Sequence, residues 1–180
     1  MEIATCWRIH VLKNSIFHCV INPVLGRNEQ SELTAWQWWL AVSRYNYKDG
    51  LIYTDYQKEG DPETIYPSKT LWTLGNYSRF IRPGAVRVDL QGVDEIDGLL
   101  GSAYKSAQNR ELILVFVNMD GIEKSVSLQT KNLPEGVMLN PMVSYVTSEQ
   151  DDLKKYSPVP TDETIVVPAR SVITLVTNIK

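Results

Sequence analysis

The second half of the sequence, from Pro83 onward, consists of short apolar runs separated by turn residues, and this pattern restricts the fold more than any other feature. The run 112–118 is continuously apolar and rich in β-branched residues, which is typical of a central strand. Seven or so short strands with regular turns over about a hundred residues are the pattern of an antiparallel β-sandwich. The other predicted strands are 85–90, 99–107, 124–130, 137–147, 164–167 and 171–177.

Two local signals refine this arrangement. Asp120-Gly121 follows the central strand and predicts a hairpin that returns into 124–130. Pro141 lies inside 137–147 and cannot donate a ladder hydrogen bond, so we expect that strand at an edge of a sheet or at a bulge.

One helix is predicted, over residues 69–81. Ser68 follows Pro67 and is a suitable N-cap. Gly75 lies inside the helix, where glycine costs up to ~1 kcal/mol relative to alanine, so we expect another part of the chain to approach the helix closely there. The apolar residues that recur at helical spacing are Leu71, Leu74, Tyr77 and Ile81.

The part of the chain before the helix has a less regular pattern. Residues 1–33 contain apolar positions of mixed periodicity that fit either a strand or a short helix. Residues 34–42 are predicted to form a buried strand and residues 51–55 a short extended segment. Residues 57–63 contain Gly60 and Pro62 and predict an exposed loop.

Composition and charge exclude several classes of function. The chain has 180 residues, of which 43% are apolar, so it can form a real core. Its net charge is −3, and no basic block with interleaved aromatic residues is present, so we expect no nucleic-acid binding. No apolar run reaches the ~18 residues that a membrane span needs, and the N-terminus does not have the pattern of a signal peptide. The cellular compartment is left open.

The cysteines and histidines lie together near the N-terminus but fit no ligand spacing. Cys6 and Cys19, with His10 and His18, match no zinc or CxxC pattern, so we expect no metal site. A disulfide between the two cysteines is possible, and two free thiols fit the sequence at least as well. No glycine-rich phosphate loop is present, and no cofactor is expected.

The most aromatic stretch of the chain is Trp36-Gln37-Trp38-Trp39. If this stretch is a strand, its alternation places Trp36 and Trp38 on one face and Gln37 on the other. An indole ring can cover the apolar face of a sugar, while an amide hydrogen-bonds its hydroxyls. Trp36, Gln37 and Trp38 are therefore candidate carbohydrate-binding residues, and the alternative is a core strand with bulky side chains.

Several stretches in collinear order resemble the C-terminal part of glycoside hydrolase family 30, which includes glucocerebrosidase, glucuronoxylanases and endo-β-1,6-galactanases. They are Trp36-Gln37-Trp38-Trp39, Gly50-Leu51-Ile52-Tyr53, the segment 71–88, the strand 111–118 and the segment 168–174. The resemblance covers about residues 34–179. The Trp-Gln-Trp-Trp and Arg-Tyr-Asn-Tyr pieces are most similar to the galactanase or xylanase branch, so the implied substrate is a β-galactan or a xylan.

The resemblance implies a division of the chain into three parts. Family members have a (β/α)₈ barrel fused to a β-sandwich side domain. Residues 34–82 would then be the last βα unit of the barrel, residues 83–180 the sandwich, and residues 1–33 an unassigned segment. The implied fold is mainly β, with one helix in the partial barrel unit. Active sites of such barrels lie at the C-terminal ends of the strands, where Trp36, Gln37 and Trp38 would contribute to a sugar subsite.

The catalytic residues of the family are not expected in this chain. Retaining glycosidases need two carboxylates ~5–5.5 Å apart. In the family these follow the fourth and seventh barrel strands, whereas residues 34–40 correspond to the eighth. Asn28-Glu29 spells a similar pair but lacks the preceding apolar strand, so we interpret it as a chance match. We therefore assign no catalytic residue and expect a structural, non-catalytic part of a glycoside hydrolase.

Two alternatives remain open at this point. The chain could be a carbohydrate-binding module with weak affinity through Trp36, Gln37 and tyrosines, or a glycosidase that uses its own Glu29 or Glu32 with a second carboxylate. A last barrel strand without its neighbours should also bury its apolar residues in another way. Packing on the sandwich, pairing with residues 3–21 and formation of a homodimer are the three possibilities.

Overall fold

The computed structural model describes residues 37–45, 47–55, 62–93, 96–106, 108, 110–131 and 135–180. The chain divides into two units, residues 1–74 and 75–180. This division falls inside the helix, and the predicted domain boundary at 82/83 stays a prediction. The predictions for Cys6, His10, His18, Cys19, Glu29, Glu32 and Trp36 concern residues outside the described part.

Unit 1 contains a three-stranded sheet in the order β1-β2-β3. The strand β1 (Val42–Ser43) is parallel to β2 (Ile52–Thr54), which is antiparallel to β3 (Ile65–Pro67). The predicted extended segment 51–55 is confirmed by β2, whereas β3 was not predicted. Both edges of this sheet are short strands.

The predicted buried strand over 34–42 is wrong for its described residues. Residues 37–41 form no strand, and β1 begins only at Val42. The physical reason is local, because the N–H of Leu40 donates to the carbonyl of Asp49 at 3.0 Å and so enters a loop contact before the ladder with β2 begins. The alternating faces predicted for Gln37 and Trp38 therefore do not apply.

The predicted helix is confirmed as α2 (Lys69–Ser78), although it ends three residues earlier than expected. Ser68 caps it, because its Oγ accepts a hydrogen bond from the N–H of Leu71 at 3.3 Å. The close approach expected at Gly75 is also found. A Cβ placed on Gly75 would lie 3.3 Å from Leu153 Cδ2, tighter than an ordinary contact.

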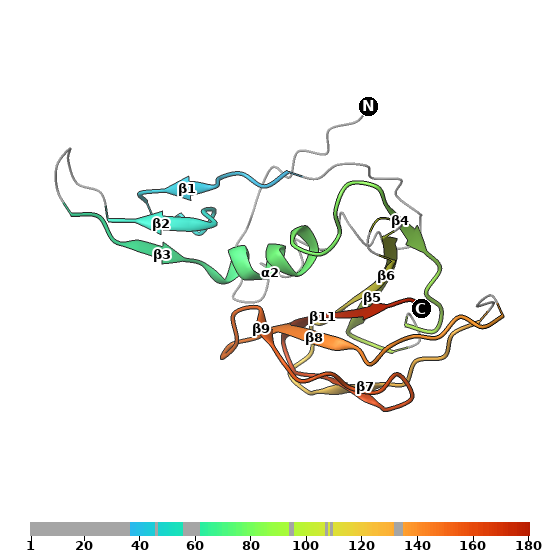
Figure 1. Ribbon diagram of the computed structural model, residues 1–180. Coiled ribbons are helices and arrows are strands. Elements are labelled where there is room, and N and C mark those ends of the chain that lie inside the picture. Colours follow the sequence, from blue (N-terminus) through green and yellow to red (C-terminus); the bar gives the residue numbers. More distant parts are fainter. Residues whose placement is uncertain are drawn as a thin grey trace. The chain divides into compact units, whose positions relative to one another are not determined.

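Unit 2 is built on a six-stranded antiparallel sheet in the order β4-β5-β6-β11-β8-β9 (Figure 1). The central strands β6 and β11 pair over eight residues each. The strands are β4 (Ala85–Val88), β5 (Leu99–Ser106), β6 (Glu111–Asn118), β8 (Val143–Thr147), β9 (Lys154–Lys155) and β11 (Ser171–Asn178). The predicted central position of 112–118 is confirmed.

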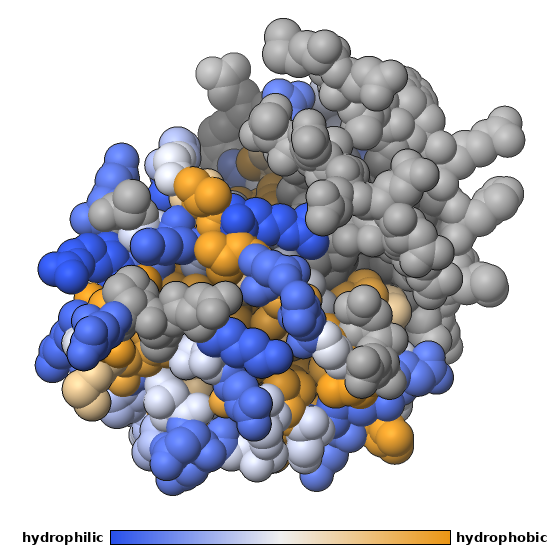
Figure 2. Space-filling view, turned by 90° about the vertical axis from the view of Figure 1, so that its right-hand side faces the viewer, coloured by the Kyte–Doolittle hydropathy of each residue, from blue (hydrophilic) through white to orange (hydrophobic). Residues whose placement is uncertain are grey.

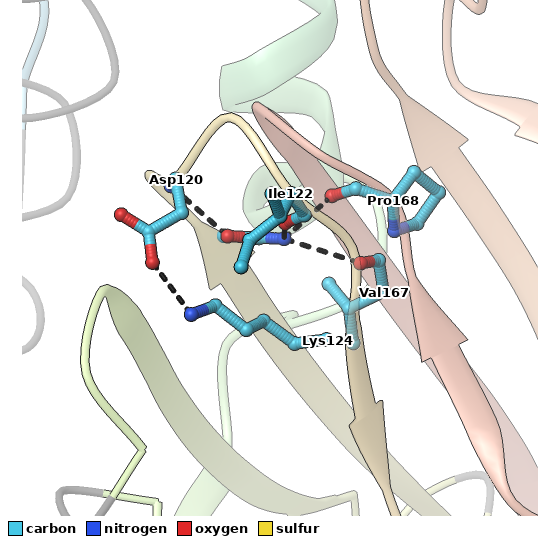
Figure 3. A network of polar contacts seen from close by, with 6 residues as sticks. Asp120, Ile122, Lys124, Val167 and Pro168 are labelled. Carbon is cyan, nitrogen blue, oxygen red and sulfur yellow. Dashed lines mark hydrogen bonds and ion pairs between the residues drawn. The ribbon is translucent and has the colours of Figure 1, made fainter.

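A second sheet pairs β7 (Lys124–Val126) with β10 (Ile165–Val167), and this pairing corrects the predicted hairpin. The chain leaves β6 through Asp120-Gly121 and crosses to the other sheet, because both edges of β6 are already paired with β5 and β11. Asn118 holds this crossing. Its Oδ1 accepts from the N–H of Asp120, and its Nδ2 donates to the carbonyls of Ile122 and Pro168 (Figure 3).

The core of unit 2 lies between these two sheets. Alternate residues of the central strands, such as Leu114 and Phe116 in β6 and Ile173 and Leu175 in β11, face it. The small sheet covers it with Val126, Ile165 and Val167. The predicted mainly β fold, with antiparallel sheets and one helix, is thus confirmed in the part of the chain that the structure describes. No helix among these residues is long and apolar enough to cross a membrane.

Asn76 forms a buried polar network on the other face of the large sheet. Its Nδ2 donates to Thr147 Oγ1 at 2.7 Å, and its Oδ1 lies 2.9 Å from the Thr174 hydroxyl that donates to it. All three side chains are fully buried. Because burial of an unpaired polar group is costly, this network ties the C-terminal part of α2 to β8 and β11.

We expect Asn76→Ala to lower the free energy of unfolding by about 2–4 kcal/mol, because it removes both contacts and leaves buried threonine hydroxyls with fewer partners. Urea unfolding followed by circular dichroism measures this change. Asn178→Ala, at an exposed position of β11, is the matched control and should stay within about 0.5 kcal/mol. Equal stability of the two variants would contradict the role given to Asn76.

Candidate functional site

The predicted carbohydrate-binding residues lie at the start of the described part of unit 1. Trp36 is outside the described residues, Gln37 is exposed and Trp38 is half-buried. The neighbouring Trp39 is 79% exposed, and the peptide bond between it and Leu40 is cis. The sugar-binding role of Trp36, Gln37 and Trp38 stays a prediction.

The indole of Trp38 is held by the main chain of a later loop. Its Nε1 donates to the carbonyl of Asp49 at 2.7 Å, and the same carbonyl accepts the N–H of Leu40. A carbonyl oxygen has two lone pairs, so both of these hydrogen bonds can form at once. The orientation of the Trp38 ring is therefore set by the position of the Asp49–Gly50 peptide.

Gly50 is fixed on both sides of its backbone. Its N–H donates to the hydroxyl of Tyr53 at 2.9 Å, and its carbonyl accepts from Ser68 Oγ at 3.0 Å. The Tyr53 ring leaves no room for a side chain, since a Cβ on Gly50 would lie 2.9 Å from Tyr53 Cε1. The pKa of Tyr53 is raised mainly by burial and also by the charge of Asp49, partly offset by the hydrogen bond from Gly50.

Two exposed tyrosines follow β1. Tyr45 and Tyr47 are exposed, with their ring centroids 5.6 Å apart, and the Arg44 guanidinium lies 5.2 Å from the Tyr45 ring. Ser43 Oγ fixes the turn before them by donating to the carbonyl of Tyr45 at 2.8 Å. Tyr45 and Tyr47 were not among the predicted site residues. Their signal was the Arg-Tyr-Asn-Tyr piece, which served only to compare branches of the family.

The carboxylates of this region have different environments. Asp55 Oδ1 accepts the N–H of Thr64 at 2.6 Å, and this hydrogen bond is the main reason why the pKa of Asp55 is lowered. Asp49 Oδ1 is buried and has no hydrogen-bond partner among the described residues. No group of three or more His, Cys, Asp or Glu side chains that could hold a metal ion occurs in the described ranges.

The tyrosines of the sandwich offer less open ring surface. Tyr104 is buried, and Tyr145 packs against Phe80 with ring centroids 4.6 Å apart, while the Arg79 guanidinium lies 5.5 Å from its ring. Tyr156 is more exposed, but Lys154 Nζ lies 5.0 Å from its ring centroid. Core or edge packing explains these three positions.

Unit 2 also contains a cavity of about 940 Å³ between its strands and the loops at residues 128–131 and 137–142. Its walls are mainly apolar, with Leu112, Leu114 and Met142 among them, and none of the described residues that line it is aromatic. Apolar side chains reach the surface among hydrophilic ones on the side of the molecule shown in Figure 2. Without a ring to stack on a sugar, this cavity does not resemble a carbohydrate site.

Comparison with known proteins finds similarity to one family. The model of O-glycosyl hydrolase family 30 matches residues 21–53, which include the tryptophan stretch and the loop that holds it. A GH30 endoxylanase from Clostridium papyrosolvens C71 is 27% identical, with a TM-score of 0.54 over 62% of this chain. The resemblance to the C-terminal part of glycoside hydrolase family 30 is confirmed.

Two further structures extend this comparison. A conserved exported protein from Bacteroides fragilis is 26% identical and gives a TM-score of 0.72 over 89% of this chain. A family 30 subfamily 8 xylanase from Clostridium acetobutylicum shares the fold, at 22% identity and a TM-score of 0.57 over 73% of this chain. The chain spans 28%, 33% and 31% of the lengths of these three proteins, in the order given.

We expect Tyr53→Phe to loosen the Trp38 indole, because the Gly50 N–H loses its acceptor and the Asp49–Gly50 peptide is then held only through the Asp49 carbonyl. Solvent exchange of the Trp38 indole proton, measured by NMR, should accelerate about tenfold, which corresponds to about 1.4 kcal/mol. Tyr47→Phe removes a hydroxyl of an exposed ring and should leave the exchange rate unchanged. An unchanged rate in Tyr53→Phe would show that the Tyr53 hydroxyl does not fix the ring.

Proposed function

We propose that this chain is a non-catalytic part of a polysaccharide-degrading glycoside hydrolase, and that unit 1 contacts a xylan-type polysaccharide through aromatic side chains. The observation that carries the binding role is the exposure of Trp39 and Tyr47, at 79% and 73%, next to a Trp38 ring held in one orientation. Exposing large apolar rings to water is unfavourable in free energy, and contact with the apolar face of a sugar would offset this.

The choice of xylan rests on the named neighbours. The endoxylanase from Clostridium papyrosolvens C71 exceeds 25% identity, and the subfamily 8 protein that shares the fold is also a xylanase. The sequence resemblance also implied β-galactan as a substrate, but neither of these two proteins is named as a galactanase. We therefore favour a β-linked xylose backbone as the ligand.

The non-catalytic role is supported by the short span of the match. The chain covers about a third of each of the two solved relatives above 25% identity, so most of what those proteins contain has no counterpart in this match. In unit 1, Asp55 is engaged with Thr64 and Tyr66, and Asp49 Oδ1 is buried. Asp49 and Asp55 therefore do not form the accessible pair of carboxylates that glycoside hydrolysis requires.

We expect β-1,4-xylo-oligosaccharides to quench or shift tryptophan fluorescence with a millimolar dissociation constant. Trp39→Ala and Tyr47→Ala should each weaken binding about three- to tenfold, the effect of ~0.5–1.5 kcal/mol per ring. Tyr156→Ala, at the exposed ring in unit 2, is the control and should bind normally. Absence of any fluorescence change up to tens of millimolar sugar would refute the binding role.

We also expect the purified chain to release no reducing ends from xylan or from nitrophenyl glycosides. The assay should include Glu29→Gln, Glu32→Gln and Asp49→Asn variants alongside the unmodified chain. Hydrolysis by the unmodified chain that disappears in one of these variants would refute the non-catalytic role and identify the acid responsible.

A further inference from the structure

Among the described residues, no second layer covers one face of the three-stranded sheet of unit 1. Its pairings place Val42 beside Ile52 and Pro67, and Thr54 beside Ile65. Since side chains alternate along a strand, these five share one face of the sheet. Val42 and Ile65 are 53% and 64% exposed, and none of the five is buried.

This face has no charged side chain on its strands. The five residues that form it are four apolar residues and one threonine. A charged partner therefore finds no side chain of opposite charge on this face. Two copies of this sheet can therefore lie side by side, with these faces continuous, without bringing like charges on them together, which is compatible with an isologous contact.

β3 is an edge strand of this sheet in the described part of the chain, and its outward main-chain groups decide how a second copy would bind. The N–H of Asp55 donates to the carbonyl of Thr64 at 3.4 Å, so residues 55 and 64 form a hydrogen-bonded pair of the ladder. Because such pairs alternate along an antiparallel ladder, Ile65 belongs to a pair without hydrogen bonds to β2. Its N–H and C=O therefore point away from β2, beside a side chain that is itself exposed.

We propose that β3 pairs with β3 of a second copy of this chain, antiparallel and across a two-fold axis at Ile65. The two Ile65 residues then exchange a reciprocal pair of hydrogen bonds and lie side by side. Glu63 faces Pro67 of the other copy. Proline donates no hydrogen bond, but its carbonyl accepts one from the N–H of Glu63. The two sheets join into one, and their apolar faces become continuous.

The short edge sets the strength of this dimer. A standard interface buries about 800 Å² on each partner, and a strand of three residues offers less. The dimer is therefore weak and forms reversibly in the micromolar to submillimolar range. This contact is separate from sugar binding and does not depend on it.

Sedimentation equilibrium of the full chain over about 5–500 µM tests the proposal, and the unmodified protein should show a monomer–dimer equilibrium. Ile65→Pro removes an outward N–H but none that is bonded to β2, so it spares the hydrogen bonds of the ladder with β2 and abolishes the reciprocal ones, along with the isoleucine side chain. Ile65→Lys places two like charges opposite each other. Each variant should raise the dissociation constant about tenfold or more.

Ile122→Lys is the matched control, since Ile122 is 66% exposed in unit 2, and it should dimerise normally. Circular dichroism confirms that the variants are folded. A monomer at every concentration would overturn the proposal and leave this face to another partner. A dimer that persists in Ile65→Pro and Ile65→Lys would also overturn it, because the contact would then lie elsewhere.

Discussion

The eight-residue ladder between β6 and β11 is the interaction on which unit 2 depends. Both strands are buried on both faces along most of their length, so each residue pair stabilises the main-chain ladder and the packing on either side. β5 and β8 add to the outer edges of this pair, and Asn76 reaches β11 from the helix. The second sheet then closes the core that the ladder exposes on its other face.

The sequence predicted most strands of unit 2 because their signal is local. Apolar, β-branched runs and turn residues are visible in any window, and β5, β6, β10 and β11 lie where they were expected. Partners are not a local property. Asp120-Gly121 looked like a hairpin, but β6 had both edges occupied, and Asn118 directs the chain to the other sheet instead. A buried asparagine at the end of an apolar strand was the available signal.

The candidate site was predictable only in part. The tryptophan stretch was visible at once, but its periodicity indicated a strand, whereas the structure fixes Trp38 through the carbonyl of Asp49. That hydrogen bond joins residues eleven positions apart through a main-chain carbonyl, so it could not be predicted from the pattern of side chains. Tyr45 and Tyr47 lie in a connection between parallel strands that contains no helix, an arrangement that propensities did not indicate.

The hydroxyl of Ser68 serves two elements at the same time, since it accepts from the first turn of α2 and donates to the carbonyl of Gly50. Aspartate caps helices as well as serine does, but its carboxylate can only accept. Aspartate therefore cannot replace Ser68 here without losing the hydrogen bond to the carbonyl of Gly50. Only a residue with a hydroxyl group can, through one side-chain atom, both cap α2 and donate to the carbonyl of Gly50, next to the peptide that holds Trp38.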